Sequence, residues 1–222
     1  MPKVTPEYIE NKKKMIVESA YRVCLKKPVE TVTISDVIAE TGMSMGAIYR
    51  YFSGLDEILV HMVREMRKEY DSYDRIIALS KEEGLTFEEI IYKAFDILGD
   101  VMEKHLMDIQ KINFDFGVLA INNPERMKKI MNEIAERGTL ENLGQYIFPK
   151  MIEAVGKQGF QAHISNEELV LFISTAFTGI EKNCILSACY GSGIPGVTIE
   201  PKPLFRTLAK SVILLMGGSV NE

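Results

Sequence analysis

The residues from Thr33 to Phe52, TISDVIAETGMSMGAIYRYF, decide how the rest of the chain is interpreted. Thr33, followed three residues later by Asp36, forms a capping-box pattern that starts a helix, with aspartate in place of the usual glutamate. Gly42 stands where this helix must end and the chain must turn, a position that glycine tolerates best. Ser44 can then cap a second short helix that ends in an aromatic cluster. Two short helices around a glycine turn form a helix-turn-helix, whose second helix can enter the major groove of DNA.

The same spacing is found in ordinary helical hairpins inside bundles, so spacing alone leaves both interpretations open. The detail comes from residues 42–52, GMSMGAIYRYF, and from residues 56–59, DEIL, which follow them. This run closely resembles the TetR family of bacterial transcription regulators. The family pattern is a glycine, an apolar residue, Ser, any residue, Gly, a small residue, an apolar residue, Tyr, any residue, an aromatic residue or His, and Phe, followed by an acidic pair and a leucine-like residue. The resemblance covers about the first 60 residues.

The resemblance implies an all-α fold, with an N-terminal three-helix helix-turn-helix DNA-binding domain and a C-terminal helical domain for ligand binding and dimerisation. We expect the DNA-binding domain at residues 1–54, a connecting helix at 55–80, and the ligand-binding and dimerisation domain at 81–222. One departure is Leu55, where the family usually has a lysine that touches a DNA phosphate. The resemblance therefore implies one backbone contact fewer than is usual in the family.

Several residues of the motif are candidates for contact with double-stranded operator DNA. The second motif helix should enter the major groove, and the short side chains of its first half let the backbone approach the bases. Arg50 could read a guanine or contact a phosphate, whereas Met45 can offer only apolar contact, for example to a thymine methyl group. Helix-capping hydroxyls can contact phosphates, and the two tyrosines resemble family tyrosines that do so, although they could also serve in packing. The candidates are Thr33, Ser44, Met45, Gly46, Ala47, Tyr49, Arg50 and Tyr51, whereas Val37, Ile48 and Phe52 are expected in the core.

The charge distribution agrees with this placement of a DNA-binding region. The chain of 222 residues has a net charge of −5, which is unusual for a DNA-binding protein. Residues 1–53 nevertheless contain eight Lys and Arg against six Asp and Glu, whereas the remainder contains 18 against 25. The basic excess therefore lies where the motif lies, and attraction to phosphates should be local.

Other classes of protein find little support in the sequence. It contains no G-x-S-x-G, H-E-x-x-H, phosphate-loop or Rossmann pattern, so we expect no enzyme and no cofactor. Three scattered histidines and three cysteines suggest no metal site and point to reduced thiols. No apolar run approaches the ~18–20 residues of a membrane span, and the first residues have no apolar signal core. We therefore expect a cytoplasmic protein with no membrane partner.

The rest of the chain is expected to be helical. Helical periodicity predicts a first helix at 12–26 and later helices at 86–102, 109–121, 125–136, 140–157, 166–190 and 202–217. The last two are apolar on more than one side and must bury more than one face. Burial inside one protomer would satisfy this pattern, and so would a homodimer in which these two helices meet their copies, as the family implies. We favour the dimer because twofold symmetry doubles the contacts of a short helix-turn-helix.

A ligand pocket is expected among the helices of the body. Residues 108–121, DIQKINFDFGVLAI, mix aromatic and polar residues, as small-molecule pockets do, although an ordinary core would look similar. Asn113 shares a helical stripe with Ile109 and Phe116, so we expect Asn113, and not Asp115, to face the pocket. The predicted ligand-binding residues are Phe95, Met102, Asn113, Phe116, Tyr146 and Phe177.

These observations lead to one functional hypothesis and one alternative. The hypothesis is a homodimeric regulator of transcription, acting as a repressor that a small apolar or amphipathic inducer releases from its operator. The alternative is a TetR-like DNA-binding module that a protein partner controls, without a small-molecule inducer. The sequence identifies neither the inducer nor the operator.

Overall fold

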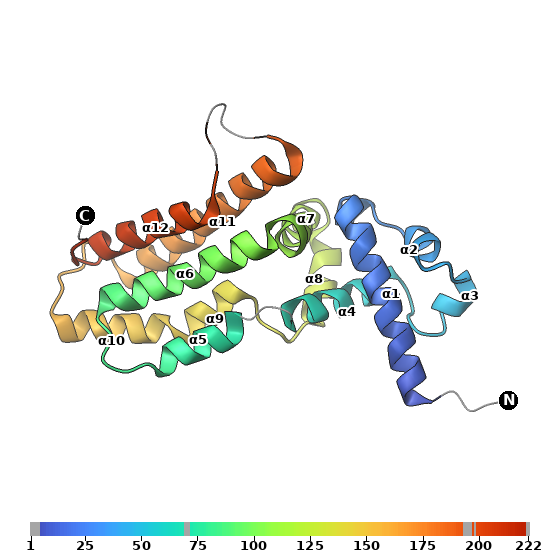
Figure 1. Cartoon of the computed structure of the whole chain (residues 1–222), viewed down its shortest axis with the longest axis horizontal. Helices are drawn as coiled ribbons and strands as arrows, with labels where there is room; N and C mark the ends of the chain where they lie inside the picture. The colour runs from blue at the N-terminus through green and yellow to red at the C-terminus, as the bar shows by residue number, and fades with distance from the viewer. Residues whose placement is uncertain (1–4, 69–71, 193–196, 198, 221–222) are drawn as a thin grey trace. The chain divides into compact units, whose positions relative to one another are not determined.

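The computed structural model describes residues 5–68, 72–192, 197 and 199–220 (Figure 1). Every regular element in these ranges is helical, which confirms the all-α prediction. The chain divides into two compact units. Unit 1 contains α1–α4 together with α7 and α8, whereas unit 2 contains α5, α6 and α9–α12. The units do not follow the predicted boundaries at 54 and 80, because α7 and α8 belong with the amino-terminal helices.

Unit 1 is built around the helix-turn-helix. Its first helix begins earlier than predicted, because Thr5 accepts a hydrogen bond from the Tyr8 N–H and Pro6 occupies the first helical position. It ends before Pro28, which has no N–H with which to continue the helix. The elements are α1 (Pro6–Lys26), the 3₁₀ turn η1 (Val29–Thr31), α2 (Ile34–Thr41), α3 (Met45–Ile48), α4 (Leu55–Lys68), α7 (Lys111–Asn122) and α8 (Pro124–Asn132).

The core of unit 1 explains why the motif has its shape. Val37 and Ile48 are completely buried and Phe52 almost so, which confirms their predicted place in the core. They lie there with apolar residues from the inner faces of α1 and α4, including Ile16, Ala20, Cys24, Ile58, Leu59 and Met62. A helix as short as α3 has little stability of its own, so this burial holds it in place.

Unit 2 is a helical bundle in which α6 and α12 pack closely against each other (Figure 1). Gly99 of α6 allows the close approach, because a Cβ at this position would come within 3.2 Å of the Lys202 side chain. Phe205 is fully buried beside them and contacts the Phe177 ring at 5.8 Å. The elements are α5 (Ser72–Lys81), α6 (Phe87–His105), the π-helical turn η2 (Leu106–Gln110), α9 (Thr139–Tyr146), α10 (Phe148–Gln158), α11 (Asn166–Tyr190) and α12 (Pro201–Leu215).

Two predicted helices differ from those observed. The connecting helix predicted at 55–80 corresponds to α4 and α5, and its middle, residues 69–71, lies outside the described residues. The helix predicted at 140–157 is two helices, α9 and α10, which meet at Ile147. Pro149 explains this break, because proline has no N–H for the carbonyl four residues earlier and is tolerated only in the first turn of a helix.

Helix α11 is more exposed than its composition suggests. By length and composition it could cross a membrane, so the expectation that no segment is long and apolar enough was wrong. Only 17% of its apolar window is buried inside the protomer. Large apolar side chains on α11 reach solvent, with Leu171 61% exposed and Val170 46% exposed. An apolar face of this kind usually marks an interaction surface.

The turn of the motif provides a test of the fold. Gly42 has a φ of +68°, and no atom lies within 4 Å of a Cβ built there, so Gly42→Ala should cost only backbone strain. We expect a loss of about 1–2 kcal/mol in the free energy of unfolding, the cost of placing an L-residue in the left-handed region. Gly117→Ala in the middle of α7, where the space is also open, should instead gain about 0.5–1 kcal/mol. Denaturant unfolding followed by circular dichroism measures both, and equal effects of the two variants would contradict this account.

Candidate nucleic-acid interface

The first motif helix is anchored by the predicted capping box. The Thr33 hydroxyl accepts from the Asp36 N–H at 3.3 Å, and Asp36 Oδ2 accepts from the Thr33 N–H at 2.7 Å. The same oxygen accepts from Lys27 Nζ at 2.8 Å. Hydrogen bonds from Lys27 first and from Thr33 second lower the pKa of Asp36 from 3.8 to about 2. The start of α2 is therefore held by an ionised carboxylate at all ordinary pH values.

The turn and the second motif helix follow from local hydrogen bonds. The Thr41 hydroxyl donates to the Ile38 carbonyl and accepts from the Met43 N–H, which closes the end of α2. Ser44 caps α3, with its Oγ 3.3 Å from the Ala47 nitrogen. The α-helix ends at Ile48 and does not reach Phe52 as predicted; residues 49–51 form a turn, in which the Ile48 carbonyl accepts hydrogen bonds from the nitrogens of residues 51 and 52. The chain continues to Phe52 as a tighter turn.

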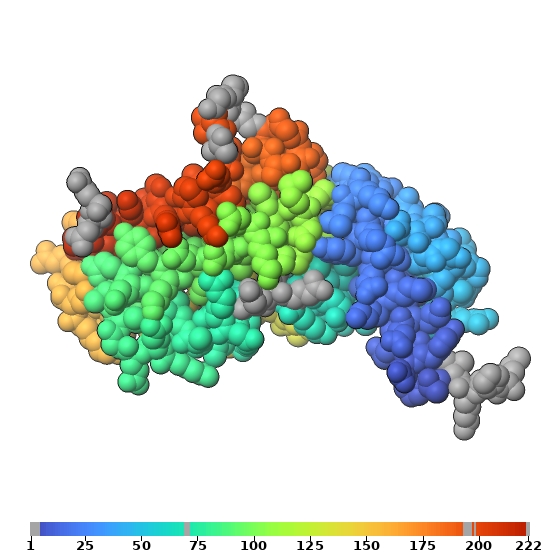
Figure 2. All heavy atoms as spheres, in the orientation of Figure 1, coloured from blue at the N-terminus to red at the C-terminus, as the bar shows by residue number. Residues whose placement is uncertain are grey.

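The candidate DNA-contacting residues lie on the accessible side of this motif. Met45 is 52% exposed and Tyr49 is 48% exposed, although both are large apolar or aromatic side chains. Arg50 is also exposed, whereas Ala47 and Tyr51 are half-buried. The other candidates, Thr33, Ser44 and Gly46, are exposed. In Figure 1, α3 lies at the end of unit 1 opposite to α7 and α8, and the space-filling view in Figure 2 shows this end at the surface of the unit. Contact of these eight candidate residues with DNA remains a prediction.

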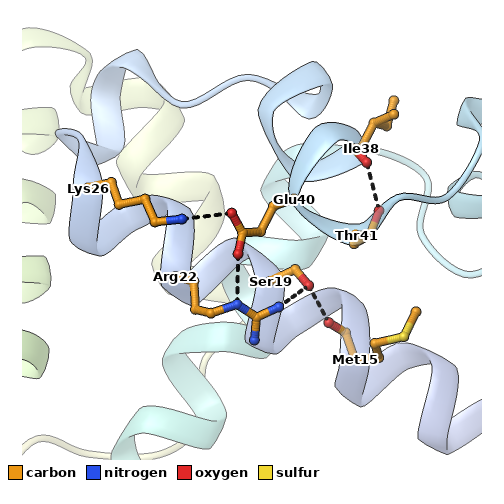
Figure 3. A network of polar contacts seen from close by, with 7 residues as sticks. All are labelled: Met15, Ser19, Arg22, Lys26, Ile38, Glu40 and Thr41. Carbon is orange, nitrogen blue, oxygen red and sulfur yellow. Dashed lines mark hydrogen bonds and ion pairs between the residues drawn. The ribbon is translucent and has the colours of Figure 1, made fainter.

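Ion pairs decide which basic side chains of unit 1 are available to an anion. Figure 3 shows Glu40 of α2 between two cations of α1, with Arg22 Nε and Lys26 Nζ each 2.8 Å from its carboxylate. Arg22 also donates to the Ser19 hydroxyl at 2.7 Å. These hydrogen bonds, from Lys26 first and Arg22 second, lower the pKa of Glu40. Lys27 is paired with Asp36 in the same way. Lys14 also lies 3.9 Å from the Glu18 carboxylate, so four of the eight basic residues counted in the sequence are paired with a carboxylate.

The remaining cations among the described residues of this set lie on α1 and in the turn directly after α3. Lys12 lies over the Tyr8 ring at 5.6 Å and Lys13 over the Phe52 ring at 6.0 Å. Within the described part of unit 1, Lys12, Lys13 and Arg50 make no ion pair with a carboxylate. Sequence reasoning missed this division, because Glu40 and Arg22 are far apart along the chain and meet only through packing of α1 on α2. The available positive charge is thus smaller and more localised than the composition indicates.

The start of α4 lies beside the motif and carries the departure at Leu55. Leu55 is half-buried at the first position of α4. The Ser53 N–H and hydroxyl donate to Glu57 at 2.6 and 2.8 Å, which lowers the pKa of that carboxyl. The His61 ring packs edge-on against Phe52 at 5.3 Å, and burial lowers the pKa of the imidazole. No cation occupies the place of the family lysine at residue 55.

A cavity of about 310 Å³, partly open to solvent, lies in unit 2 between α6, α9, α10 and α11. None of its lining side chains is charged, and Ser174 carries the one side-chain hydroxyl among them. The lining residues are Ala94, Phe95, Leu98, Leu140, Leu143, Gly144, Ile147, Phe148, Met151, Val170, Ile173 and Ser174. The cavity suits an apolar molecule near the lower limit of the usual size for ligand pockets.

Most of the predicted ligand-binding residues do not line this cavity. Phe95 does, whereas Met102 and Phe177 pack in the core of unit 2 beside it and Tyr146 packs edge-on against Tyr73 at 6.2 Å. Asn113 and Phe116 belong to unit 1. The six predicted residues are therefore not one cluster, because helical spacing cannot show which helices pack together.

Of the two polar residues of α7 that were compared, Asp115 is the one that the structure buries. Asp115 is 3% exposed and faces the core of unit 1, whereas Asn113 is half-buried. The physical reason is Lys111, one turn earlier on α7, whose ammonium lies 2.9 Å from the Asp115 carboxylate. A buried carboxylate is tolerated when a cation and hydrogen-bond donors meet it. The i, i+4 spacing of the two residues was a signal that could have identified this pair.

The described part of the chain contains no candidate metal site, and its buried cysteines are not activated nucleophiles. Its residues contain no group of three or more His, Cys, Asp or Glu side chains that could hold a metal ion. Burial raises the pKa of the Cys24 thiol to about 12 and that of the Cys184 thiol to about 11. Both are protonated thiols and behave as small apolar side chains.

Comparison with known proteins agrees with a nucleic-acid interface. Residues 16–62 match the family model described as bacterial regulatory proteins, tetR family. Two curated relatives come from Bacillus subtilis (strain 168). The uncharacterized HTH-type transcriptional regulator YfiR is 28% identical over 135 residues, which cover 56% of this chain and 59% of the relative. The HTH-type transcriptional regulator PksA is 29% identical over 138 residues, which cover 62% of this chain and 63% of the relative. The chain thus matches about three fifths of the length of these relatives.

Solved structures show the same fold over nearly the whole chain. A transcriptional regulator from Rhodococcus sp. RHA1 superposes with a TM-score of 0.61 at 18% identity, covering 95% of this chain and 99% of that protein. The fatty acid degradation regulator FadR from Bacillus halodurans superposes with a TM-score of 0.59 at 16% identity, covering 95% and 97%. At these identities the likeness concerns the fold alone.

Proposed function

We propose that this chain, which belongs to the tetR family of bacterial regulatory proteins, regulates transcription by sequence-specific binding of double-stranded operator DNA. One observation carries the proposal. Ser44, Met45, Gly46, Tyr49 and Arg50 are exposed, whereas Ile48 between them is completely buried. A short helix that is held by its core side and open on its other side is the form of a recognition helix. The relatives are named as transcriptional regulators and not as enzymes, which agrees with this function.

The chemistry of the exposed face suits a DNA duplex. Gly46 and Ala47 leave the backbone of α3 free to approach base edges, and Met45 can contact a thymine methyl group. Arg50 supplies a cation that no carboxylate of the described residues neutralises. The hydroxyls of Thr33 and Ser44 and the phenols of Tyr49 and Tyr51 can bind phosphate oxygens, which position the protein without reading sequence.

The proposal includes a homodimer formed through α11 and α12. Leu171 and Phe172 of α11 and Leu214 of α12 are large apolar side chains that reach solvent in the protomer. A twofold axis through this surface would bury them and present two copies of α3 to successive major grooves, which lie about 34–36 Å apart. Symmetry of this kind fits a nearly palindromic operator. Cys24, Cys184 and Cys189 form no disulfide among the described residues, which is consistent with a cytoplasmic protein.

The proposal also includes release from the operator by a small apolar or amphipathic ligand, so that the protein acts as a repressor. The cavity of about 310 Å³ in unit 2 favours control by a small ligand over control by a protein partner. A helical body that only contacts a protein partner would need no such space between its helices. The ligand would act through a difference in affinity between a DNA-binding and a non-binding conformation. An uncharged lining selects molecules whose buried part carries no charge.

Two substitutions directly after α3 test the DNA interface. Arg50→Ala should cost about 1–3 kcal/mol of binding free energy and lower the salt slope by about one, because one cation no longer displaces a counterion. Tyr49→Ala should also weaken binding, because a phenol near the phosphates is lost. Fluorescence anisotropy with a duplex that the wild-type protein selects from a random-sequence pool measures both, with Lys157→Ala on α10 as the control. Unchanged affinity and salt slope in both the Arg50→Ala and the Tyr49→Ala protein would show that this part of the motif does not contact DNA.

The proposed dimer is tested by a charge on the exposed face of α11. Leu171→Glu should convert the dimer to a monomer in sedimentation velocity and abolish tight binding to the selected duplex, because the new carboxylate would be buried without a partner. Ile121→Glu on α7, where the native side chain is 81% exposed, is the matched control and should remain dimeric. A Leu171→Glu protein that sediments as a dimer would place the interface elsewhere.

The cavity can be filled from within to test ligand binding. Gly144 lines it and has open space around an added Cβ, so Gly144→Leu should occupy the volume without displacing the backbone. We expect saturable binding of the uncharged fluorescent probe N-phenyl-1-naphthylamine to the wild type and its loss in this variant, with DNA binding preserved. Gly156→Leu on α10, equally open but outside the cavity, is the control. Equal probe binding by wild type and Gly144→Leu would show that this cavity is not the ligand site.

A further inference from the structure

A buried ion pair on α7 joins this helix to the helix-turn-helix. Lys111 and Asp115 are 8% and 3% exposed, and their charged atoms lie 2.9 Å apart. Both side chains also reach backbone groups of the amino-terminal helices. Lys111 Nζ donates to the carbonyl of Cys24 at 2.9 Å, and Asp115 Oδ2 accepts from the Val29 N–H at 3.3 Å. The pair thus spans the connection between α1 and α2.

The two backbone groups that the pair reaches are ones that this connection cannot satisfy itself. The carbonyl of Cys24 would normally accept from the N–H four residues later, but that residue is Pro28, which has none. The N–H of Val29 opens the 3₁₀ turn η1 and has no carbonyl of that turn available to it. Lys111 therefore caps the negative end of α1, and Asp115 caps the donor end of η1. The polarity matters, because each charge faces the backbone group of complementary sign.

Stability alone does not account for such a pair. Removing two charges from water costs about as much as their attraction returns, so a buried pair is weak support for a fold. What its hydrogen bonds supply is direction, because they hold only at one position of α7 against the α1–α2 connection. A further bond at 2.8 Å, from Asn122 Nδ2 to Glu30, fixes the other end of α7 to the same turn. The turn η1 is separated by Val32 alone from Thr33, which caps α2.

We propose that Lys111 and Asp115 are positioning residues for DNA binding, which set the orientation of the α1–α2 connection and through it that of the reading helix. This inference rests on the proposed function. The pair touches no part of the exposed α3 face and acts through η1, the Thr33 cap and α2. Its effect should therefore fall on the discrimination between a specific and an unrelated duplex, which requires the correct orientation of α3, and not on attraction to phosphates in general.

Reversal of the pair provides the sharpest test. The double substitution Lys111→Asp with Asp115→Lys retains two opposite charges at i, i+4 spacing but points each one at a backbone group of like sign. The matched control is the exposed pair on α10, Glu153→Lys with Lys157→Glu, whose side chains are 2.6 Å apart and contact no orphan backbone group. Affinities for the selected duplex and for a scrambled duplex are measured at one salt concentration, at a temperature where circular dichroism shows each protein folded.

We expect the reversed α7 pair to lose about tenfold or more in affinity for the selected duplex, while its affinity for the scrambled duplex stays as in the wild type. The control reversal should change neither value. An unchanged ratio of the two affinities in the α7 reversal would overturn the proposal. Should that protein fail to fold, Asp115→Asn keeps the shape of the side chain and a weaker acceptor for Val29. A wild-type ratio in a folded Asp115→Asn protein would overturn the proposal as well.

Amide hydrogen exchange separates this inference from the proposed function. If the wild type selects no duplex from the pool, the proposed function fails. The positioning of the connection is then judged by exchange alone. The α7 reversal should accelerate exchange of the amides from Val29 to Thr33 while the control reversal leaves them protected. Unchanged protection of these amides in the α7 reversal would show that the pair does not hold the turn.

Discussion

The burial of Ile48 and Phe52 is the constraint on which the candidate interface depends. Helix α3 has four residues in α-helical conformation, far fewer than an isolated helix needs in water. Its conformation therefore depends on tertiary packing, because the large side chains of Ile48 and Phe52 are buried in the core of unit 1. Because those side chains fix the inner face, the outer face can carry Gly46, Ala47 and Tyr49, which contribute little to packing. The buried side of this short segment thus stabilises the unit, and its exposed side remains accessible to a binding partner.

Ion pairs in unit 1 determine which basic side chains remain available to a phosphate. Carboxylates of α2, Asp36 and Glu40, bind the cations of α1 and its connection and hold the two helices together. These exposed pairs add little free energy each, but they remove Arg22, Lys26 and Lys27 from the positive charge that a phosphate could meet. Arg50, Lys12 and Lys13 make no such ion pair among the described residues. An acidic remainder of the chain then discourages contact with DNA through any other surface.

The two compact units show how segments distant in sequence share one task. Helices α7 and α8 lie between α6 and α9 in the chain, yet they pack with the amino-terminal helices. Besides the buried pair on α7, Arg126 of α8 donates to Asp56 at the start of α4 through two nitrogens, at 2.7 and 2.9 Å. Both nitrogens donate to the same oxygen, Asp56 Oδ1, so the guanidinium is held against this carboxylate by two charge-assisted hydrogen bonds. Unit 1 is thus a helix-turn-helix braced by a hairpin from the middle of the chain.

Local patterns were sufficient to predict what depends on neighbouring residues. Thr33 with Asp36, Gly42 and Ser44 each act within four residues, so the sequence alone determined the two motif helices and their turn, and it indicated the family whose model residues 16–62 match. The same is true of the buried positions Val37, Ile48 and Phe52, which follow from helical spacing. Pro149 could have revealed the break between α9 and α10. These features need no knowledge of the rest of the molecule, because their hydrogen bonds and steric limits are local.

Contacts between distant segments were decided only by the tertiary structure. Helical spacing correctly placed Asn113 and Asp115 on different faces of one helix, but it could not say which face would meet α1. That choice was made by the orphan carbonyl of Cys24 and the orphan N–H of Val29, which draw Lys111 and Asp115 inward. The cavity in unit 2 also arises from helices far apart in sequence, so of the predicted ligand residues only Phe95 lines it. A sequence specifies which side chains a helix presents, whereas packing determines what they meet.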